Sequence, residues 1–358
     1  MKTMHHTGGR VYILILNWNG WKDTIECLES VFHSDYTDFR VIVCDNDSKD
    51  GSLGYIKDWA DARLAASAVN PAFNYIICPP VGKPIAYAEY GRVAAENGGD
   101  KKIDHALVLI QTGGNLGFAG GNNVGLRYVE ARNDAAFVWL LNNDTIITSN
   151  SLTQIVRRSL MSQQIGICGS LVRYYFQPLV TQTLGGCVYN KWFGIAKNIG
   201  HMQGASTRID RNAVERKLDY VLGASMLISV KCLSTIGLMN ESYFLYYEEI
   251  DWAVRASGKF TLAFAPDSVV YHKDGASIGS RLSESPILRY RSEYFLIRNR
   301  IKFTANHFPY AMPTVYVGLV LTFLIRLLRG QWSRAVMLVK ALCDTAPSGQ
   351  QGRTIDRI

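Results

Sequence analysis

A carboxylate that directly follows an apolar run could hold a metal ion in this sequence. Residues 137–141 are apolar, and 142–145 then read Asn-Asn-Asp-Thr. The carboxylate of Asp144 suits a hard divalent cation, Mg²⁺ or Mn²⁺, held against a diphosphate. Taken alone, the tetrapeptide is better explained by a turn or a helix cap before Leu152. His272 also ends an apolar run, although a lone histidine there is more often structural than a metal ligand.

Three carboxylates within four positions are the strongest candidates for proton transfer. Glu248, Glu249 and Asp251 stand among aromatic residues, where buried carboxylates are costly unless they are paired or used. Asp251 and Arg255 are four residues apart and would pair on a helix. A solvated acidic helix end is the alternative, and it fits poorly with the aromatic residues around it.

Two loops rich in glycine and polar residues could hold a nucleotide. In residues 45–52, Asp45 could accept hydrogen bonds from a pyrimidine base and Asp47 or Asp50 could lie near the ribose, although the same residue types make ordinary turns. In residues 113–125, glycines would let the backbone approach a ligand, and amides at the following helix start could hold phosphate or sugar oxygens. A merely flexible loop is the alternative. The candidate ligand-binding residues of this second loop are Asn115, Gly117, Gly121 and Asn122.

Alternating strands and helices would bring these segments together. Apolar runs predict buried parallel strands at 11–16, 39–44, 106–110 and 137–141. Helical patterns are found at 23–32, 122–131 and 152–162, and less regular strand-like segments at 166–172, 189–199 and 220–230 precede a helix at 230–236. This alternation predicts an α/β fold, a mostly parallel sheet flanked by helices, with ligands at the carboxyl ends of its strands. Residues 55–104 are the least regular part, which we interpret as an insertion with a strand near 75–78.

The C-terminal part differs from the rest in charge. Between Ser285 and Lys340 nine basic residues face a single acid, Glu293, so this window alone accounts for the net charge of +8. The same stretch is apolar, which favours an anionic membrane surface over nucleic acid as its partner. We therefore predict a catalytic domain over 1–284, a basic helical extension over 285–345 and a disordered tail over 346–358.

The most apolar part of this extension is residues 314–328, which are shorter than the ~20 residues of a membrane-spanning helix and end in arginines. A helix on the membrane surface or a re-entrant helix is preferred, and a helix buried on the domain is the alternative. The seven cysteines are scattered and form no CxxC pair, which fits a reducing compartment. The apolar run before Asn17 is too short for a signal peptide, so a cytoplasmic protein is expected.

Taken together and in this order, the motifs resemble the family 2 glycosyltransferases with the GT-A fold, and among them the bacterial rhamnosyltransferase-type enzymes of cell-surface polysaccharide assembly. The resemblance covers roughly residues 11–308 without the insertion, and the segments that carry it are 15–19, 45–52, 115–122, 141–145, 248–255 and 271–272. It implies that Glu249 is the catalytic base, with Glu248, Asp251 and Arg255 beside it.

The same resemblance implies the ligands of the donor site. Asn17, Asn19 and Asp45 would line the nucleoside pocket, and Asn143 would also contact the nucleotide sugar. Asp144 would be the metal-binding residue of the family's DXD motif, and His272 a further metal ligand. Two positions depart from the family pattern, because the first DXD position is Asn142 and the base is Glu where Asp is commoner.

The implied activity is the inverting, metal-dependent transfer of a sugar to a hydroxyl of a cell-surface glycan precursor. Rhamnose from dTDP-rhamnose is the favoured donor, while UDP-galactose, UDP-galactofuranose and UDP-N-acetylglucosamine remain open. A catalytically inactive nucleotide-sugar-binding protein is the alternative from another class. The implied acceptor is a lipid-linked glycan at the cytoplasmic face of the cell membrane, with no nucleic acid as partner, and a homo-oligomer is left open.

Overall fold

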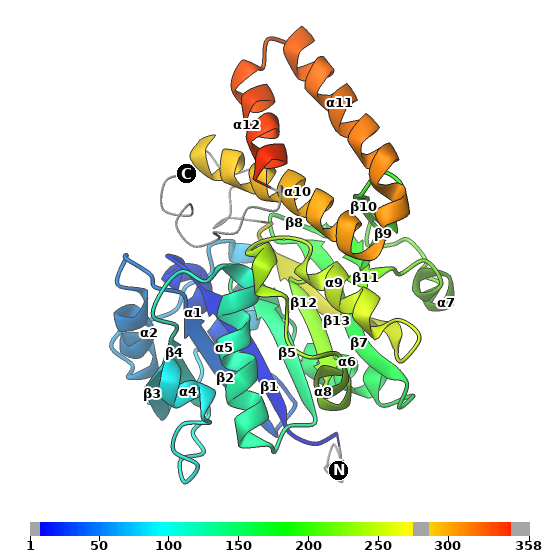
Figure 1. Cartoon of the computed structure of the whole chain (residues 1–358). Helices are drawn as coiled ribbons and strands as arrows, with labels where there is room; N and C mark the ends of the chain where they lie inside the picture. The colour runs from blue at the N-terminus through cyan, green and yellow to red at the C-terminus, as the bar shows by residue number, and fades with distance from the viewer. Residues whose placement is uncertain (1–7, 275–285, 345–358) are drawn as a thin grey trace.

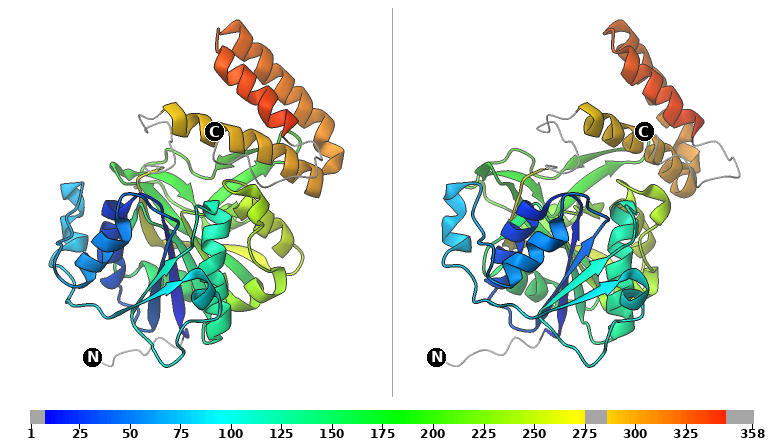
Figure 2. Two further views of the ribbon diagram at one scale, coloured as in Figure 1. Left: turned by 60° about the vertical axis from the view of Figure 1, so that its left-hand side comes forward. Right: turned by 90° about the vertical axis from the view of Figure 1, so that its left-hand side faces the viewer.

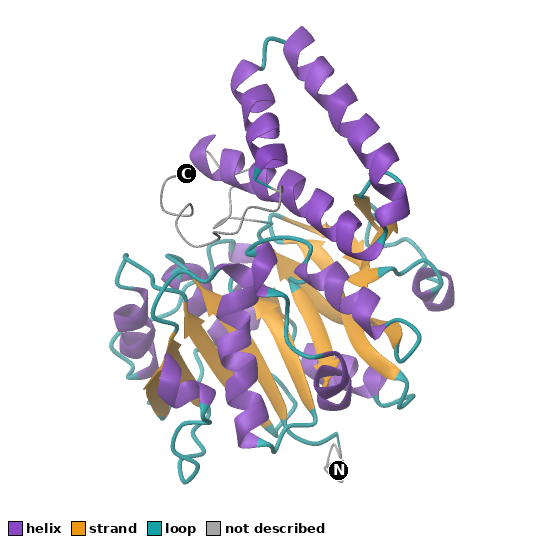
Figure 3. Ribbon diagram, viewed as in Figure 1, coloured by secondary structure: helices purple, strands orange, loops and turns teal. Residues whose placement is uncertain are grey.

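The computed structural model describes residues 8–274 and 286–344, and the predicted disordered tail lies outside them. A large central sheet carries helices on both faces (Figures 1 and 3). Its strands are β1 (Val11–Asn17), β2 (Phe39–Asp45), β3 (Tyr87–Gly91), β4 (Leu107–Gln111), β5 (Phe137–Asn142), β6 (Thr145–Ile147), β7 (Ile165–Tyr174), β8 (Gln177–Leu184), β12 (Ser225–Ser229) and β13 (Thr261–His272). A small second sheet contains β9 (Gly186–Asn190), β10 (Ile195–Asn198) and β11 (Tyr220–Val221).

The helices cover the sheet and extend beyond it. They are α1 (Trp21–Phe32), α2 (Ser52–Ala60), α3 (Asn74–Ile77), α4 (Arg92–Glu96), α5 (Gly117–Arg132), α6 (Ser151–Ser159), α7 (Arg211–Glu215), α8 (Val230–Ile236), α9 (Glu248–Ala256), α10 (Pro286–His307), α11 (Met312–Leu328) and α12 (Trp332–Cys343). The predicted α/β class and most predicted elements are therefore confirmed, with ends that differ by a few residues.

The large sheet is mostly parallel, as predicted. Its strand order is β3-β4-β2-β1-β5-β12-β7-β13-β6, with β8 beside β7. The first five strands of this order run parallel, β12 is antiparallel to both of its neighbours, and β13 is again parallel to β7. Successive side chains of a strand point to opposite faces, so β1 contributes to two hydrophobic clusters. Residues 12 and 14 belong to one cluster, and residues 11, 13 and 15 belong to the other. Helices α1, α2 and α6 cover one face, and α4, α5, α8 and α9 cover the other.

Helix α5 begins five residues earlier than the predicted start at residue 122. Its glycines explain the difference, because they let the helix lie directly on β1. A methyl group on Gly121 would be 2.4 Å from Cδ1 of Leu16, and one on Gly125 would be 2.3 Å from Cδ1 of Leu14. The glycine-rich segment is thus largely helix, and much of its composition serves close packing of helix on strand.

Residues 55–104 are part of the domain rather than a separate appendage. The strand predicted near 75–78 is wrong: the side chain of Asn70 accepts a hydrogen bond from the amide of Ala72, and a short 3₁₀ turn from Pro71 leads into α3. A polar cap followed by proline favours the start of a helix over a strand. Further along, β3 extends the sheet beside β4, and Trp59 of α2 is fully buried beneath this region.

The C-terminal helices form a structure of their own on top of the domain. Helix α10 lies over the edge where the parallel strands end, and α11 and α12 form a hairpin that projects away from the sheet (Figures 1 and 2). Among the described residues, Pro309–Leu328 is the one helix long and apolar enough to cross a membrane by length and composition, and only 22% of its apolar window is buried. The alternative of a helix buried on the domain therefore does not fit, and the helix is longer than the predicted 314–328.

Candidate active site

The carboxyl ends of the parallel strands bring the predicted site segments to one edge of the sheet. In the strand register, Asn17 pairs with Asp45 and Asp45 pairs with Gln111. On the other side of β1, Asn142 pairs with Leu16. The expected convergence of these loops follows from this register, since parallel strands end on the same side.

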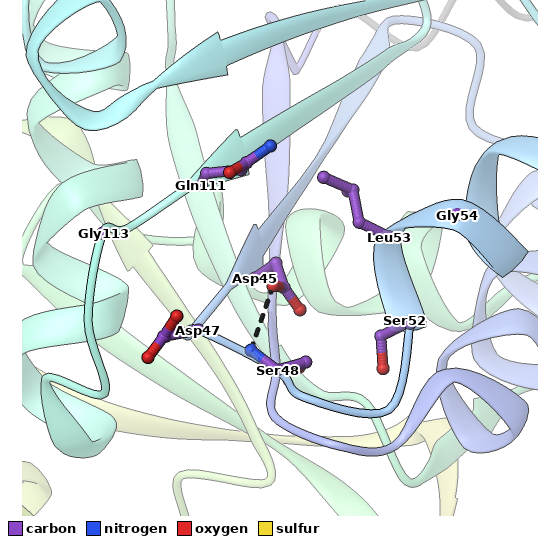
Figure 4. Close-up of a pocket in the computed structure, with 9 residues that line it drawn as sticks. Asp45, Asp47, Ser48, Ser52, Leu53, Gly54, Gln111 and Gly113 are labelled. Atoms are coloured by element: carbon purple, nitrogen blue, oxygen red, sulfur yellow. Dashed lines mark hydrogen bonds between the residues drawn. The ribbon is translucent and has the colours of Figure 1, made fainter.

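Asp45 lies in a cleft of about 220 Å³ at this edge (Figure 4). Its lining residues are Asp45, Asp47, Ser48, Gly51, Ser52, Leu53, Gly54, Gln111 and Gly113. The Asp45 carboxylate is nearly buried and accepts hydrogen bonds from Nδ2 of Asn17 (2.8 Å) and from the amide of Ser48 (3.2 Å). A carboxylate fixed in this way can still accept a hydrogen bond from a planar base that enters the cleft.

Asn17 and Asn19 shape this cleft from behind. Asn17 is fully buried, and Asn19 accepts a hydrogen bond from the amide of Lys49 (2.7 Å) while its own amide donates to Oγ of Ser48. Neither residue is part of the cleft lining, and both hold Asp45 and its loop, while their predicted contact with the nucleoside stays a prediction. Asp47 does line the cleft, and its carboxylate is 2.7 Å from Nζ of the exposed Lys49.

Asp144 and His272 form a buried pair at the ends of two neighbouring strands. Oδ1 of Asp144 is 3.2 Å from Nε2 of His272, and each residue is at most 7% exposed. The other ring nitrogen, Nδ1, lies 2.9 Å from Oε1 of Gln182 and must donate to it, because an amide oxygen only accepts. Burial alone would lower the pKa of His272, but the charge and hydrogen bond of Asp144 outweigh it, and this pKa is raised.

A chain of hydrogen bonds joins the turn of Asp144 to the cleft of Asp45. Nδ2 of Asn143 donates to Oγ1 of Thr24 (3.1 Å), and this hydroxyl donates to Oδ1 of Asn17 (2.7 Å). Nδ2 of the same Asn17 donates to Asp45. Asn143 is 6% exposed, and its amide nitrogen links the two parts of the site. Its predicted contact with the nucleotide sugar stays a prediction.

Glu248 and Glu249 begin helix α9. Glu248 is 2% exposed, and its Oε2 has no hydrogen-bond partner among the described residues. Burial, and next the charge of Glu249, raises the pKa of Glu248 well above its usual range. Glu249 is partly exposed and lies against Gly223, where a methyl group would be 2.4 Å from its Oε1. Desolvation raises the pKa of Glu249 despite hydrogen bonds from backbone amides, as a general base requires.

Asp251 and Arg255 connect neighbouring helices, and their predicted role beside the base stays a prediction. Oδ2 of Asp251 accepts from Nε of Arg255 (2.7 Å), and Oδ1 is 2.8 Å from Nε2 of His307 on α10. The guanidinium of Arg255 also donates to the carbonyls of Ile236 and Leu238 at the end of α8. The pair therefore connects α9 to α8 and α10, and its charged groups are already hydrogen-bonded to each other and to these helices.

The predicted ligand-binding residues of the glycine-rich loop are placed differently from one another. Asn115 is exposed, and its Oδ1 accepts from Nδ2 of Asn46 and from the amide of Gly117, so it shapes the loop beside the cleft. Gly117 approaches the backbone of another loop: a methyl group there would lie 2.2 Å from the carbonyl oxygen of Phe244. Gly121 packs against Leu16 of β1, and the buried Asn122 donates from Nδ2 to the carbonyl of Phe118, while ligand contact by either residue stays a prediction.

Sequence reasoning missed three residues that act at the site. Gln182 orients His272, and its Nε2 donates to Oδ1 of Asp274 (3.0 Å). The charge of Asp274 also raises the pKa values of His272 and Tyr246, the latter a neighbour of the acid pair. Asn46 accepts from the amide of Leu116 and so ties the glycine-rich loop to β2. Gln182 lies in an ordinary strand pattern, so nothing in the sequence marks it as a site residue. Asn46, in contrast, lies within the segment 45–52, which the sequence marks as a candidate nucleotide loop.

The site divides into three groups along one edge: the cleft of Asp45, the pair Asp144–His272 and the pair Glu248–Glu249. The cleft lining contains none of the other two pairs. Asp274 is close enough to act electrostatically on both the metal pair and the acid-pair loop, and Asp144 acts in the same way on Asp23 of α1.

Asp144 and His272 fit a divalent cation that a diphosphate also holds. Among the described residues, no group of three or more His, Cys, Asp or Glu side chains could hold a metal ion alone. Two protein ligands suit Mg²⁺ or Mn²⁺ bound to a substrate phosphate, where the remaining ligands are phosphate oxygens and water. The glutamine behind His272 is the outer partner expected of a metal-binding histidine.

Comparison with known proteins agrees with this arrangement. Residues 12–84 match the family described as "Glycosyl transferase family 2". The chain is 29% identical over 153 residues to the low-salt glycan biosynthesis hexosyltransferase Agl10 of Haloferax volcanii. That match covers 41% of this chain and 45% of Agl10, which is less than half of the relative's length.

Two solved structures share the fold at low sequence identity. The mannosyltransferase PcManGT of Pyrobaculum calidifontis, in complex with GDP-Man and Mn²⁺, superposes with a TM-score of 0.50 and 14% identity over 96% of this chain and 88% of that one. TarS 1-349 of S. aureus, in complex with UDP-GlcNAc, gives a TM-score of 0.51 and 12% identity over 94% of this chain and 80% of that one. The chain is thus similar to glycosyl transferase family 2 over residues 12–84, and its fold is GT-A-like.

Proposed function

We propose that the protein is an inverting, metal-dependent glycosyltransferase that moves a hexose from a nucleoside diphosphate to an acceptor hydroxyl. The observation that carries this proposal is the grouping of Asp45, Asp144–His272 and Glu248–Glu249 at the carboxyl edge of one sheet. Agl10 is by its name a hexosyltransferase, and the two fold relatives are complexes with nucleotide sugars, which supports the same class of substrate here.

The chain's own residues divide the reaction between them. Asp45 and Asp47 bind the nucleoside in the cleft, and Asp144 and His272 hold the cation. When bound, this cation neutralises charge on the diphosphate. Glu249 accepts the proton of the acceptor hydroxyl as its oxygen attacks the anomeric carbon from the face opposite the diphosphate. The configuration at that carbon is inverted as a result.

The donor that we favour is dTDP-rhamnose, on the resemblance of the motifs alone. UDP-galactose, UDP-galactofuranose and UDP-N-acetylglucosamine are the alternative donors, and one experiment compares all four. Thermal shift of the full chain with each nucleotide sugar, with and without Mn²⁺, identifies the donor, because a ligand that binds only the folded state raises its stability. Transfer of radiolabelled sugar then tests catalysis. No metal-dependent shift and no transfer from any of these donors would refute the proposal.

An inactive nucleotide-sugar-binding protein is the competing function, because the first carboxylate of the DXD motif is replaced by Asn142. Nδ2 of Asn142 is 3.5 Å from Nε2 of His272, so this residue still belongs to the metal pair. Slow hydrolysis of the donor in the presence of Mn²⁺ separates the two functions. A protein that binds the donor and never cleaves it, even with a competent acceptor, would be the binding protein.

We further propose that the acceptor is a lipid-linked glycan at the cytoplasmic face of the membrane, where the protein is a peripheral protein. The hairpin α11–α12 exposes a broad apolar face, including Leu328 at 88% and Trp332 at 65% exposure. This face continues onto the turn between β9 and β10, because Oγ1 of Thr314 donates to the carbonyl of Trp192. The exposed apolar residues of this membrane face are Trp192, Phe193, Tyr310, Tyr316, Val317, Val320, Leu321, Leu324, Ile325, Leu328, Trp332, Val336 and Val339.

Charge and aromatic residues argue for lipid as the partner of this membrane face. Nζ of Lys191 lies over the rings of Trp192, Phe308 and Tyr310 at 5.5–5.9 Å. Tryptophan, tyrosine and basic residues are enriched where proteins meet the membrane–water interface. The net charge of +8 between Ser285 and Lys340 favours anionic lipids.

Binding to vesicles tests the membrane face. The double variant Leu321→Asp/Leu324→Asp is expected to lose most of its binding to phosphatidylglycerol vesicles, whereas Val93→Asp, at an apolar site on α4 that is more exposed than either leucine, should bind like the wild type. Analytical ultracentrifugation of the same variants distinguishes lipid from a second copy. Unchanged vesicle binding, or a dimer that the double variant dissociates, would overturn the choice of lipid.

A further inference from the structure

The loop before the acid pair has an unusual backbone. Phe244, Tyr246 and Tyr247 have φ angles of 67°, 68° and 79°, a left-handed conformation that bulky residues rarely adopt. Glu248 and Glu249 follow immediately, so the direction in which α9 starts depends on this loop. Such a conformation persists only where the surroundings hold it, and it is common at functional sites.

Helix α10 holds the loop chiefly through Asn299. Asn299 is fully buried, and its Nδ2 lies within hydrogen-bond distance of the carbonyl oxygens of Tyr243 (2.8 Å), Leu245 (2.7 Å) and Tyr246 (3.0 Å). The amide group has two N–H bonds, so one of them is shared between two of these carbonyls. An apolar side chain at 299 would leave the carbonyls of Leu245 and Tyr246 without this donor, which is costly.

Two further contacts hold the same loop from outside. Nη2 of Arg298 donates to the carbonyls of Ser242 (2.7 Å) and Tyr243 (3.1 Å). On the opposite side, the amide of Phe118 at the start of α5 donates to the carbonyl of Phe244 (2.6 Å). The loop is therefore fixed between α5, which carries the glycine-rich segment of the donor side, and α10, which directly precedes the hairpin α11–α12 of the membrane face.

We infer that Asn299 is a positioning residue, which sets the place of the Glu248 and Glu249 carboxylates by holding the loop 243–247. The inference rests on the proposed function, because the contacts of Asn299 with the loop matter for the rate only if Glu249 is the proton acceptor. Asn299 itself contacts no reacting atom. It acts on the rate through the geometry of the acid pair, and it leaves the cleft of Asp45 untouched.

Kinetics and hydrogen–deuterium exchange of the full-length protein test this inference together. Asn299→Ala should lower kcat by about 10²-fold, because a small displacement of a catalytic group has effects of this size. The KM for the nucleotide sugar should stay within about twofold, and amides 244–250 should exchange faster than in the wild type. Asn299→Gln keeps the amide group and should recover part of kcat.

Thr304→Val is the matched control. Thr304 is equally buried on α10, and its hydroxyl donates to the carbonyl of Arg300 within the helix. This variant should lose comparable stability and keep the kcat and loop exchange of the wild type. Equal effects of Asn299→Ala and Thr304→Val, or unchanged exchange of 244–250 in Asn299→Ala, would overturn the positioning role. If the wild type transfers no sugar at all, the proposed function fails, while the exchange data still decide whether Asn299 holds the loop.

Discussion

The nucleoside cleft and the acid-pair loop are built in opposite ways. The cleft lies between strand ends, and Asp45 is held by Asn17 of the adjacent strand and Ser48 of its own loop. The acid pair follows a strained loop that is held by Asn299, which comes 56 positions after Tyr243 in the chain. Regular secondary structure thus fixes the donor side, whereas distant side chains fix the acceptor side. Changes in the cleft should therefore affect donor binding, and changes in the acid-pair loop should affect the rate.

The largest expected effect is that of Glu249→Gln, which removes the base but keeps the shape of the side chain. Transfer should fall by ~10²–10⁴-fold, the usual contribution of a general base. Donor binding measured by calorimetry should stay nearly unchanged, because Glu249 lies outside the cleft lining. A variant that retains most of its transfer activity would show that another group accepts the proton.

Gly117→Ala tests the contact between the two regions. The new methyl group would lie 2.2 Å from the carbonyl oxygen of Phe244, and the backbone at Gly117 has a φ of 71°. The acid-pair loop must shift, so kcat should fall by about 10²-fold while donor affinity changes little. Gly237→Ala is the control, because it has a φ of 75° with nothing within 4 Å. If both variants lose kcat equally, backbone strain rather than the loop contact is responsible.

Asp45→Asn should weaken donor binding and spare the chemical step. Loss of a charged acceptor from the cleft is expected to raise the donor KM by roughly 10-fold, which corresponds to one hydrogen bond to a charged group. The kcat at saturating donor should remain within a factor of about two. Stopped-assay kinetics over a range of donor concentrations measure both values, and a fall in kcat alone would contradict the division between the regions.

The smallest expected effect is that of Glu248→Gln on the pH dependence. Glu249 is active when deprotonated and its pKa is raised, so the rate should fall as the pH decreases through that raised pKa. Burial, and next the charge of Glu249, raises the pKa of Glu248 well above its usual range, so Glu248 keeps its proton while Glu249 titrates. The neighbouring Cys187 and Tyr220 also have pKa values raised by burial and stay neutral. Glu248→Gln should therefore leave the acidic limb of the kcat profile unmoved, and a limb that moves to lower pH would show that Glu248 is charged beside Glu249.

The donor side could be predicted from sequence because its signals are local. Apolar runs that end in Asp45 and Asn142 mark parallel strands, and parallel strands that neighbour one another end at one edge. The pairing of Asp144 with His272 also followed from the motifs, which the structure places 3.2 Å apart. These features need only strand periodicity and the general topology of α/β folds.

The remaining features depend on contacts that no local pattern encodes. The ion pairs of Asp251 and the clamp of Asn299 require knowing that α10 folds back over α9. Gly121 and Gly125 suggest ligand contact until the distance from α5 to β1 is known. Residues 74–77 are apolar enough for a strand, but the cap at Asn70 makes them helical.

The late position of Asn299 has a consequence for the newly made chain. Everything that surrounds Asp45, from β1 to the start of α5, has been synthesised long before α10 emerges from the ribosome. A growing chain could then hold a nucleotide before its proton acceptor has been set in place. The enzyme would become competent for transfer only once α10 has docked, and the hairpin of the membrane face follows α10 directly in the chain, so activity and the means to reach the acceptor would be completed one after the other.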